Sequence, residues 1–215
     1  MGPLGRGFVL PKRRAHCLLV GGGIGATPLF FLADELRNEG HRVDVILGAR
    51  SAGLLLNPID ARRLASVCRT TTEDGSVGEE GRVTDVLVET MEKCETEVVY
   101  TCGPHPMLAA VSRICVEQNV PVQVAVEELM GCGYGVCMTC VMPMRNPRAG
   151  KGVADDAVVY ARSCTEGPVF NGAAVIWNGA ADPVSLDQSE LSPVGVPTRG
   201  VALAGTDDEL PPPGN

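Results

Sequence analysis

The chain has 215 residues and a net charge of −8 at pH 7; 45% of its residues are apolar and 4% are aromatic. That length allows one large domain or one domain with an appendage, and the acidic balance argues against nucleic acid or a membrane surface as a partner. No apolar run is long enough for a membrane span, and residues 1–8 lack the apolar core of a signal peptide. Nine cysteines without such a signal favour a reducing compartment, so we expect a cytoplasmic protein.

Residues 15–126 alternate short apolar runs with helical patterns, which predicts a parallel sheet with crossover helices. The first predicted strand covers residues 16–20. In the helix that follows, Thr27 is the expected N-cap and Pro28 the first helical residue, and Gly40 is expected to close it. Further strands are predicted at residues 42–47, 68–72, 97–101 and 122–126, and further helices at residues 59–66, 84–93 and 106–118.

The first predicted strand is followed by a glycine loop, residues 21–26, with the sequence GGGIGA. It fits the pattern G-x-G-x-x-G/A, in which backbone amides and a helix N-terminus hold a pyrophosphate. Alone the pattern is weak, because glycine turns between a strand and a helix often serve only packing. An ordinary Rossmann site also has Asp or Glu at the end of the second strand. Here that strand ends in Gly48, Ala49, Arg50 and Ser51, so the site departs from the ordinary pattern.

A second loop, residues 101–107 with the sequence TCGPHPM, follows another predicted strand. Ligands of open α/β sheets bind at the carboxyl ends of strands. Cys102 is therefore a candidate to face a nicotinamide, and its alternative role is that of a small buried apolar side chain. The position in the sequence does not decide between these two roles.

Four cysteines follow the pattern Cys132-x4-Cys137-x2-Cys140, with Cys164 after a loop. This is the ligand spacing of a plant-type [2Fe–2S] site. Glycines at 131, 133 and 135 allow the backbone to fold closely around a cluster. A zinc site is the alternative, but zinc sites usually have two short C-x2-C pairs or Cys/His pairs. The spacing favours the iron–sulfur cluster.

Three regions of the chain together resemble the electron-transfer subunit of bacterial type B dihydroorotate dehydrogenase, in the ferredoxin reductase-like superfamily. These regions are GGGIGATPL, VYTCGPHPML, and VEELMGCGYGVCMTCV with the later ARSCTEGPVF. The resemblance covers residues 3–177. It implies an α/β fold with a parallel-sheet NAD-binding domain of the ferredoxin reductase type, followed by a small [2Fe–2S] cluster module. The ligands it implies for the cluster are Cys132, Cys137, Cys140 and Cys164. The residues it implies for NAD are Gly21, Gly22, Gly23, Gly25 and Thr27 around the pyrophosphate, with Cys102 and Gly103 beside the nicotinamide.

The resemblance also suggests a division of the chain. Residues 15–126 would form the NAD-binding domain and residues 127–177 the cluster module, and the proline-rich residues 178–215 would be a disordered tail. The family begins with a β-barrel that holds FAD, and residues 2–8 resemble the segment that leaves it. We therefore expect residues 1–14 to be a linker from that barrel. FAD is a cofactor of the family that the chain without the barrel is not expected to retain.

The implied function is electron transfer in pyrimidine biosynthesis. An FMN-containing dihydroorotate dehydrogenase catalytic subunit would be the partner in a hetero-oligomer, and electrons would pass through the [2Fe–2S] cluster and FAD to NAD. Three alternatives remain open. The first is the flavoprotein subunit of a ferredoxin:NADP oxidoreductase, in which Arg50 and Ser51 would hold a 2′-phosphate. The others are a zinc-binding interaction module without enzymatic activity and an inert truncated product.

Overall fold

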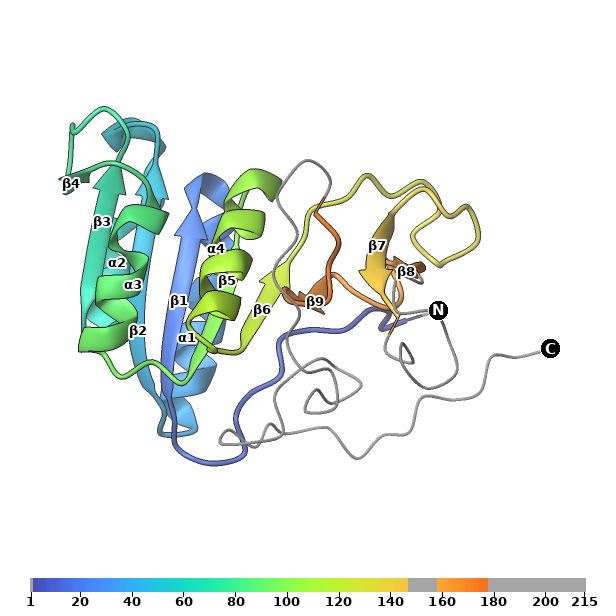
Figure 1. Ribbon diagram of the computed structural model, residues 1–215, viewed down its shortest axis with the longest axis horizontal. Helices are drawn as coiled ribbons and strands as arrows, with labels where there is room; N and C mark the ends of the chain where they lie inside the picture. Colours follow the sequence, from blue (N-terminus) through green and yellow to red (C-terminus); the bar gives the residue numbers. More distant parts are fainter. Residues whose placement is uncertain (1, 147–157, 178–215) are drawn as a thin grey trace.

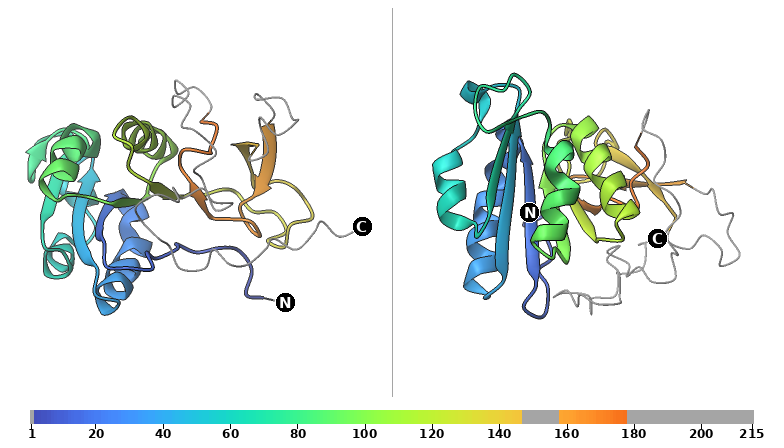
Figure 2. Two further views of the ribbon diagram at one scale, coloured as in Figure 1. Left: turned by 60° about the horizontal axis from the view of Figure 1, so that its bottom comes forward. Right: turned by 60° about the vertical axis from the view of Figure 1, so that its left-hand side comes forward.

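The structure is a computed structural model, and it describes residues 2–146 and 158–177. The predicted tail, residues 178–215, lies outside the described residues. The larger part is a seven-stranded sheet in the order β4-β3-β2-β1-β5-β6-β9, with helices on both faces (Figures 1 and 2). Its strands are β1 (His16–Gly22), β2 (Arg42–Ala49), β3 (Cys68–Thr72), β4 (Glu79–Glu80), β5 (Val98–Cys102), β6 (Val122–Ala125) and β9 (Val169–Asn171).

The sheet confirms the predicted fold class. Strands β1 to β6 are parallel to their neighbours, and β9 pairs antiparallel with β6. The predicted strands are present, and β1 extends beyond residue 20 because Gly21 and Gly22 continue the pairing with β2. The sequence did not predict β4 or β9, which are two and three residues long and carry little periodic signal.

The two faces of the sheet form two separate apolar cores, because successive side chains of a strand point to opposite faces. In β1, Leu18 and Val20 belong to one core, whereas Cys17 and Leu19 belong to the other. Helices α3 (Val83–Lys93) and α4 (His105–Glu117) cover the first core. Helices α1 (Thr27–Asn38) and α2 (Pro58–Leu64) cover the second. None of the described helices is long and apolar enough to cross a membrane.

Helix α1 begins one residue earlier than its sequence indicated. Ala26 is the N-cap and Thr27 is already helical, so the prediction of Thr27 as the N-cap was wrong. The reason is that a short 3-10 helix, η1 (Gly23–Ala26), runs directly into α1. The Thr27 hydroxyl donates to the carbonyl of Ile24 at 2.6 Å instead of capping free amides. A second 3-10 helix, η2 (Ala52–Leu54), follows β2.

After β6 the chain leaves the large sheet and forms a hairpin of β7 (Val141–Arg145) and β8 (Val158–Arg162). It then returns to add β9 to the edge of the large sheet. The segment between these strands, residues 126–168, is called the cysteine-containing region; it is joined to the large sheet by β6 at one end and by β9 at the other. Met142, Phe170 and Trp177 share the apolar core under α4. The cysteine-containing region therefore packs directly on the edge of the α/β unit.

The N-terminal segment crosses the α1 and α2 side of the sheet and ends near the hairpin (Figure 1). The backbone of Val9 is held by Gln123, whose amide group accepts from the Val9 N–H at 2.9 Å and donates to the Val9 carbonyl at 2.8 Å. Tyr100 donates to the same carbonyl at 2.9 Å, and its ring meets Phe8 edge to face. The segment is thus packed on the sheet by specific contacts.

Candidate functional site

The loop between β6 and β7 surrounds two of the predicted cluster ligands with hydrogen-bond donors. The amides of Val136 and Cys137 point at the Cys132 sulfur at 3.3 and 3.4 Å. The amide of Cys132 points at the Cys137 sulfur at 3.4 Å, and the Thr139 hydroxyl donates to the same sulfur at 3.1 Å. These donors stabilise thiolates. The backbone donors, that of Cys137 first, lower the pKa of Cys132 to about 6, and the Thr139 hydroxyl is the main cause of a lowered pKa at Cys137.

Glycines make this loop geometry possible. Gly133 and Gly135 have φ values of +74° and +88°, a region that other residues enter only with strain. A Cβ atom on Gly131 would lie 3.1 Å from the Cys137 sulfur. The carbonyl of Gly135 accepts a hydrogen bond from Arg162 of β8 at 3.2 Å, so the hairpin holds the loop in place.

The other two predicted ligands lie deeper. Cys140 and Cys164 are buried, and their side chains interact with one another. Burial first, and the neighbouring Cys140 second, raise the pKa of Cys164, to which Cys132 also contributes electrostatically. The amide of Ser163 donates to the carbonyl of Cys140 at 2.9 Å, which fixes the distant segment against the loop. The fold thus brings residues from both sides of the hairpin together.

The four thiols are therefore arranged as two pairs, Cys132 with Cys137 and Cys140 with Cys164. Among the described residues, no group of three or more His, Cys, Asp and Glu side chains is placed to hold one metal ion. Two cysteine pairs suit the two irons of a [2Fe–2S] cluster, which takes four cysteine ligands. Amide donors to sulfur and glycines at tight turns are further features that fit such a cluster.

A cavity of about 740 Å³ opens at the carboxyl ends of β1, β2 and β3 and at the first turns of α3 and α4. Gly22 and Gly23 of the glycine loop line it. The other predicted nucleotide residues, Gly21, Gly25, Thr27, Cys102 and Gly103, are not part of this lining. The rest of the lining comes from Ile24, the ends of β2 and β3, residues 53–56 after β2, the start of α3, and Pro104 with the first turns of α4.

Two of the predicted glycines have a packing role that the structure makes clear. A Cβ atom on Gly25 would lie 2.6 Å from the Cα atom of Gly103, so the two predicted ligand loops touch through their backbones. A Cβ atom on Gly21 would lie 2.6 Å from the Cβ atom of Ala26. Cys102 packs against the core under α1 and α2, and burial first, then Glu127, raises its pKa to about 11. The Cys102 thiol is therefore protonated at neutral pH.

The structure adds residues to the cavity that sequence reasoning missed. Thr71, Glu73, Arg82 and Thr84 all line it. The rule that seeks an acidic residue at the end of the second strand, applied to the third predicted strand as well, would have found Glu73, one residue beyond Thr72.

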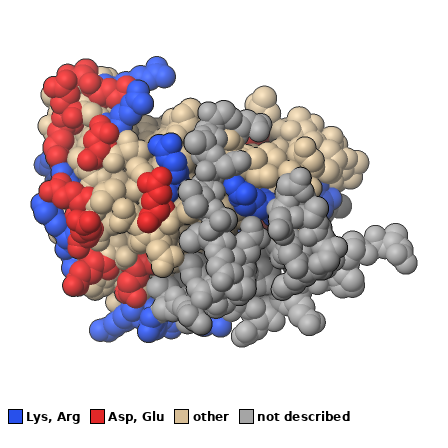
Figure 3. Space-filling model, in the orientation of Figure 1, with Lys and Arg blue, Asp and Glu red and all other residues tan. Residues whose placement is uncertain are grey.

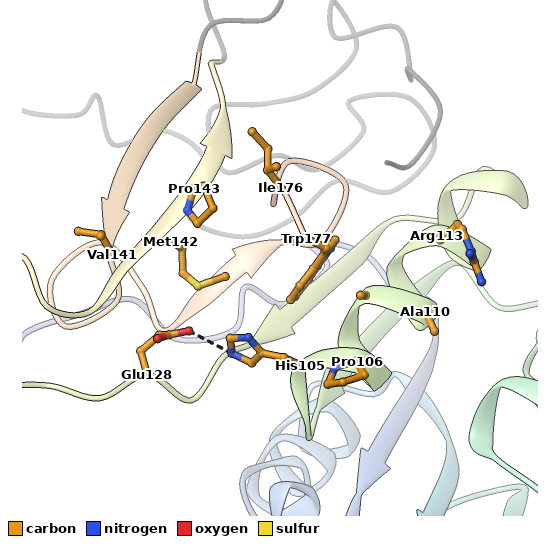
Figure 4. A pocket seen from close by; sticks show the side chains of 11 residues that line it. His105, Pro106, Ala110, Arg113, Glu128, Val141, Met142, Pro143, Ile176 and Trp177 are labelled. Carbon is orange, nitrogen blue, oxygen red and sulfur yellow. Dashed lines mark ion pairs between the residues drawn. The ribbon is translucent and has the colours of Figure 1, made fainter. Parts of the chain in front are cut away.

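A second cavity of about 620 Å³ lies between α4, β7 and residues 176–177 (Figure 4). In its wall, His105 Nε2 lies 3.0 Å from Glu128 Oε1, a contact that is an ion pair when His105 is protonated. The His105 ring also meets the Trp177 ring edge to face, at 6.0 Å between centroids. These contacts tie the loop that follows β5 to the cysteine-containing region.

Comparison with known families agrees with both halves of the site. Residues 19–113 match the family model described as an oxidoreductase NAD-binding domain. Residues 127–176 match the one described as the iron–sulfur cluster binding domain of dihydroorotate dehydrogenase B. All four predicted cluster cysteines fall within the second match.

Curated relatives carry the same designation. Proteins named dihydroorotate dehydrogenase B (NAD(+)), electron transfer subunit, are 37% identical over 177 residues in Desulforamulus reducens and 40% identical over 172 residues in Shouchella clausii. The matches cover 82% and 79% of this chain, and 64% and 61% of the relatives. The chain thus spans less than two thirds of the length of these proteins.

A solved structure also shares the fold. The structure of an NADH-dependent reduced ferredoxin-NADP oxidoreductase aligns with a TM-score of 0.67 and 25% identity, over 89% of this chain and 65% of that one. The chain is therefore similar to the dihydroorotate dehydrogenase B electron transfer subunits, and it joins a segment that matches an oxidoreductase NAD-binding domain to one that matches the iron–sulfur cluster binding domain of dihydroorotate dehydrogenase B.

Proposed function

We propose that this chain transfers electrons between the FMN of a dihydroorotate dehydrogenase catalytic subunit and NAD, with a [2Fe–2S] cluster and FAD as the intermediate centres, in pyrimidine biosynthesis. The observation that carries the proposal is the presence, on one continuous fold, of a nucleotide-sized cavity and two cysteine pairs, one of which is surrounded by donors that stabilise thiolates. The names of the relatives support the same assignment.

The positions of these sites indicate which segment of the chain binds which cofactor. We infer that residues 15–126 bind the dinucleotide and that residues 127–177 hold the cluster through Cys132, Cys137, Cys140 and Cys164. Residues 1–14 would link to a flavin-binding part, and residues 178–215 would be dispensable for both sites. When bound, the cofactors supply the redox chemistry, in which a cluster moves single electrons, nicotinamide needs two, and a flavin converts between them.

The chain's own residues would position these groups. In the glycine loop, Gly22 and Gly23 bring backbone to the cavity wall, where no side chain keeps a pyrophosphate at a distance. Gly21 and Gly25 would shape that loop through their close approach to Ala26 and Gly103, and Thr27 through the hydrogen bond of its hydroxyl to the Ile24 carbonyl. Cys102 and Gly103 would border the nicotinamide end. Around the sulfurs, the amides of the cysteine loop supply fixed donors that stabilise negative charge.

The surface of the cysteine loop supports a protein partner. Five large apolar side chains on it are exposed: Leu129, Met130, Tyr134, Val136 and Met138. Leu129 and Val136 are 85% and 70% exposed. Contiguous exposed apolar side chains commonly mark protein interaction sites. A catalytic subunit that covers this loop would bring its own redox centre towards the cluster and exclude water from it.

The proposal is tested by mixing the anaerobically purified, cluster-loaded chain with the catalytic subunit of a bacterial type B enzyme and dihydroorotate. The cluster should become reduced, with loss of its visible absorbance and appearance of its paramagnetic resonance signal. Dithionite serves as the control for a reducible cluster. A cluster that dithionite reduces and dihydroorotate leaves oxidised contradicts the proposal.

A ferredoxin:NAD(P) oxidoreductase is the second candidate function. The shared fold with a reduced ferredoxin-NADP oxidoreductase favours it, and so do Arg50 and Arg82 in the wall of the cavity, where they could meet a 2′-phosphate. In the same experiment, reduced ferredoxin replaces dihydroorotate and its catalytic subunit as the electron source. Reduction by ferredoxin alone would assign this function in place of the first.

A further inference from the structure

We propose that Glu73, together with Thr71, recognises the adenosine ribose of the dinucleotide and makes this cavity select NAD(H) over NADP(H). The inference rests on the proposed function as far as nucleotide binding is concerned, and it adds the residues that set the choice of nucleotide. It also explains how a site without an acidic residue at the end of the second strand can bind the ribose, because Glu73 takes that role.

The sheet topology decides which end of the dinucleotide lies near Glu73. The strand order reverses at β1, with β2 and β3 on one side and β5 and β6 on the other. In such sheets the ligand crosses this point, with its pyrophosphate at the loop after β1. The nicotinamide is assigned to the β5 side, beside Cys102 and Gly103. The adenosine half therefore lies over the ends of β2 and β3.

Glu73 stands next to the place where an ordinary site has its acidic residue. Its amide donates to the carbonyl of Ala49 at the end of β2, at 3.1 Å. The next amide, of Asp74, donates to the carbonyl of Arg50 at 3.2 Å. The end of β3 is thus paired with the end of β2, so Glu73 can offer from the neighbouring strand the carboxylate that β2 lacks.

Thr71 is the second, independent observation. It lines the cavity and is 1% exposed, and its hydroxyl is buried without a hydrogen-bond partner among the described residues. A buried hydroxyl without a partner is costly, and a ligand hydroxyl would satisfy it. Thr71 lies in β3 and Glu73 in the turn that follows it, and both line the cavity.

The charges around Glu73 favour a ribose hydroxyl over a phosphate. Arg82, which also lines the cavity, faces the Glu73 carboxylate, with 4.0 Å between Arg82 Nε and Glu73 Oε1. Part of the positive charge in this wall is thus already opposed. Asp and Glu side chains also gather over the side of the molecule that carries β3, β4 and α3 (Figure 3). A ribose 2′-hydroxyl can donate to Glu73, whereas a dianionic 2′-phosphate would be repelled by it.

The test measures binding and does not depend on electron transfer. Dissociation constants for NADH and NADPH, and for adenosine 5′-monophosphate and adenosine 2′,5′-bisphosphate, are determined calorimetrically on the full chain, on Glu73→Gln and on Glu80→Gln. The Glu80→Gln variant is the matched control, because Glu80 is an exposed carboxylate on the adjacent β4 outside the cavity lining. A thermal melt of each variant checks folding.

The unmodified chain should bind NADH about tenfold or more tightly than NADPH, since a hydrogen bond to a charged group is worth about one to two powers of ten. Glu73→Gln should shrink that ratio about tenfold or more, in both nucleotide pairs, and Glu80→Gln should leave it unchanged. An unchanged ratio in Glu73→Gln, or an equal or tighter affinity of the unmodified chain for NADPH, overturns the inference. If the chain binds NADH selectively but its cluster takes no electrons from dihydroorotate, the proposed function alone is contradicted. If the chain binds none of the four nucleotides, both the inference and the proposed function are overturned.

Discussion

The contact between the two ligand loops leads to a prediction about Gly25→Ala. The added Cβ atom would lie 2.6 Å from Gly103 Cα, 2.8 Å from Gly103 N and 3.1 Å from the carbonyl carbon of Cys102. All three are backbone atoms, so no side-chain rotation relieves the overlap, and one loop must move away from the other. Overpacking of this kind costs about 1–3 kcal/mol.

In a chain of this size each kcal/mol corresponds to roughly 2–4 °C, so the melting temperature of Gly25→Ala should fall by about 2–12 °C. Affinity for NADH should fall as well, because the loops that follow β1 and β5 would separate. Thermal unfolding followed by circular dichroism and calorimetric titration with NADH measure the two effects. Gly7→Ala is the control, since a Cβ atom at Gly7 meets nothing within 4 Å. A Gly25→Ala variant that melts with the control and binds NADH equally well would refute the close contact of the loops.

Two further predictions concern the cluster loop and the α3 surface. Thr139→Val removes the hydroxyl that donates to the Cys137 sulfur at 3.1 Å, so a redox titration should show a lower reduction potential of the cluster. The control variant Thr84→Val should leave the potential unchanged. An unchanged potential in Thr139→Val would contradict the role of that donor. The ion pairs of Glu89, with Lys93 first and Arg69 second, hold its pKa at about 2, so the stabilisation they provide is present above the ordinary carboxyl pKa and is lost as the pH falls through the folded-state value. Glu89→Gln should therefore be less stable than the unmodified chain at neutral pH, and urea titrations should show this difference shrinking as the pH falls towards 2. An equal difference at both pH values would show that the ion pairs do not act.

The parallel sheet could be predicted because its strands are buried on both faces and alternate with helical patterns. The short elements could not, since the three residues of β9 gain their strand conformation from pairing with β6 and not from their own pattern. The start of α1 was misplaced for a similar reason. The sequence TP is typical of a cap, yet the 3-10 turn before it carries the helix through Thr27.

The candidate sites were predictable to different degrees. The spacing of Cys132, Cys137 and Cys140 lies within one loop and can be recognised directly. The contact of Cys164 with Cys140 depends on the hairpin that brings the distant segment back, which spacing alone does not place. Glu73 escaped notice because the acidic-residue rule was applied to the second strand alone, and the pairing that brings the end of β3 beside the end of β2 is seen in the folded sheet.

Metal and sulfide analysis of the anaerobically purified chain tests most directly whether the two cysteine pairs hold one [2Fe–2S] cluster. Iron and acid-labile sulfide should be present in the amounts of one [2Fe–2S] cluster per chain, with a red-brown visible spectrum. Cys137→Ser should lose both, whereas Cys94→Ser, which alters a buried thiol in the core of the α/β unit, should keep them. Stoichiometric zinc in a colourless protein, or a cluster that survives Cys137→Ser, would contradict the account.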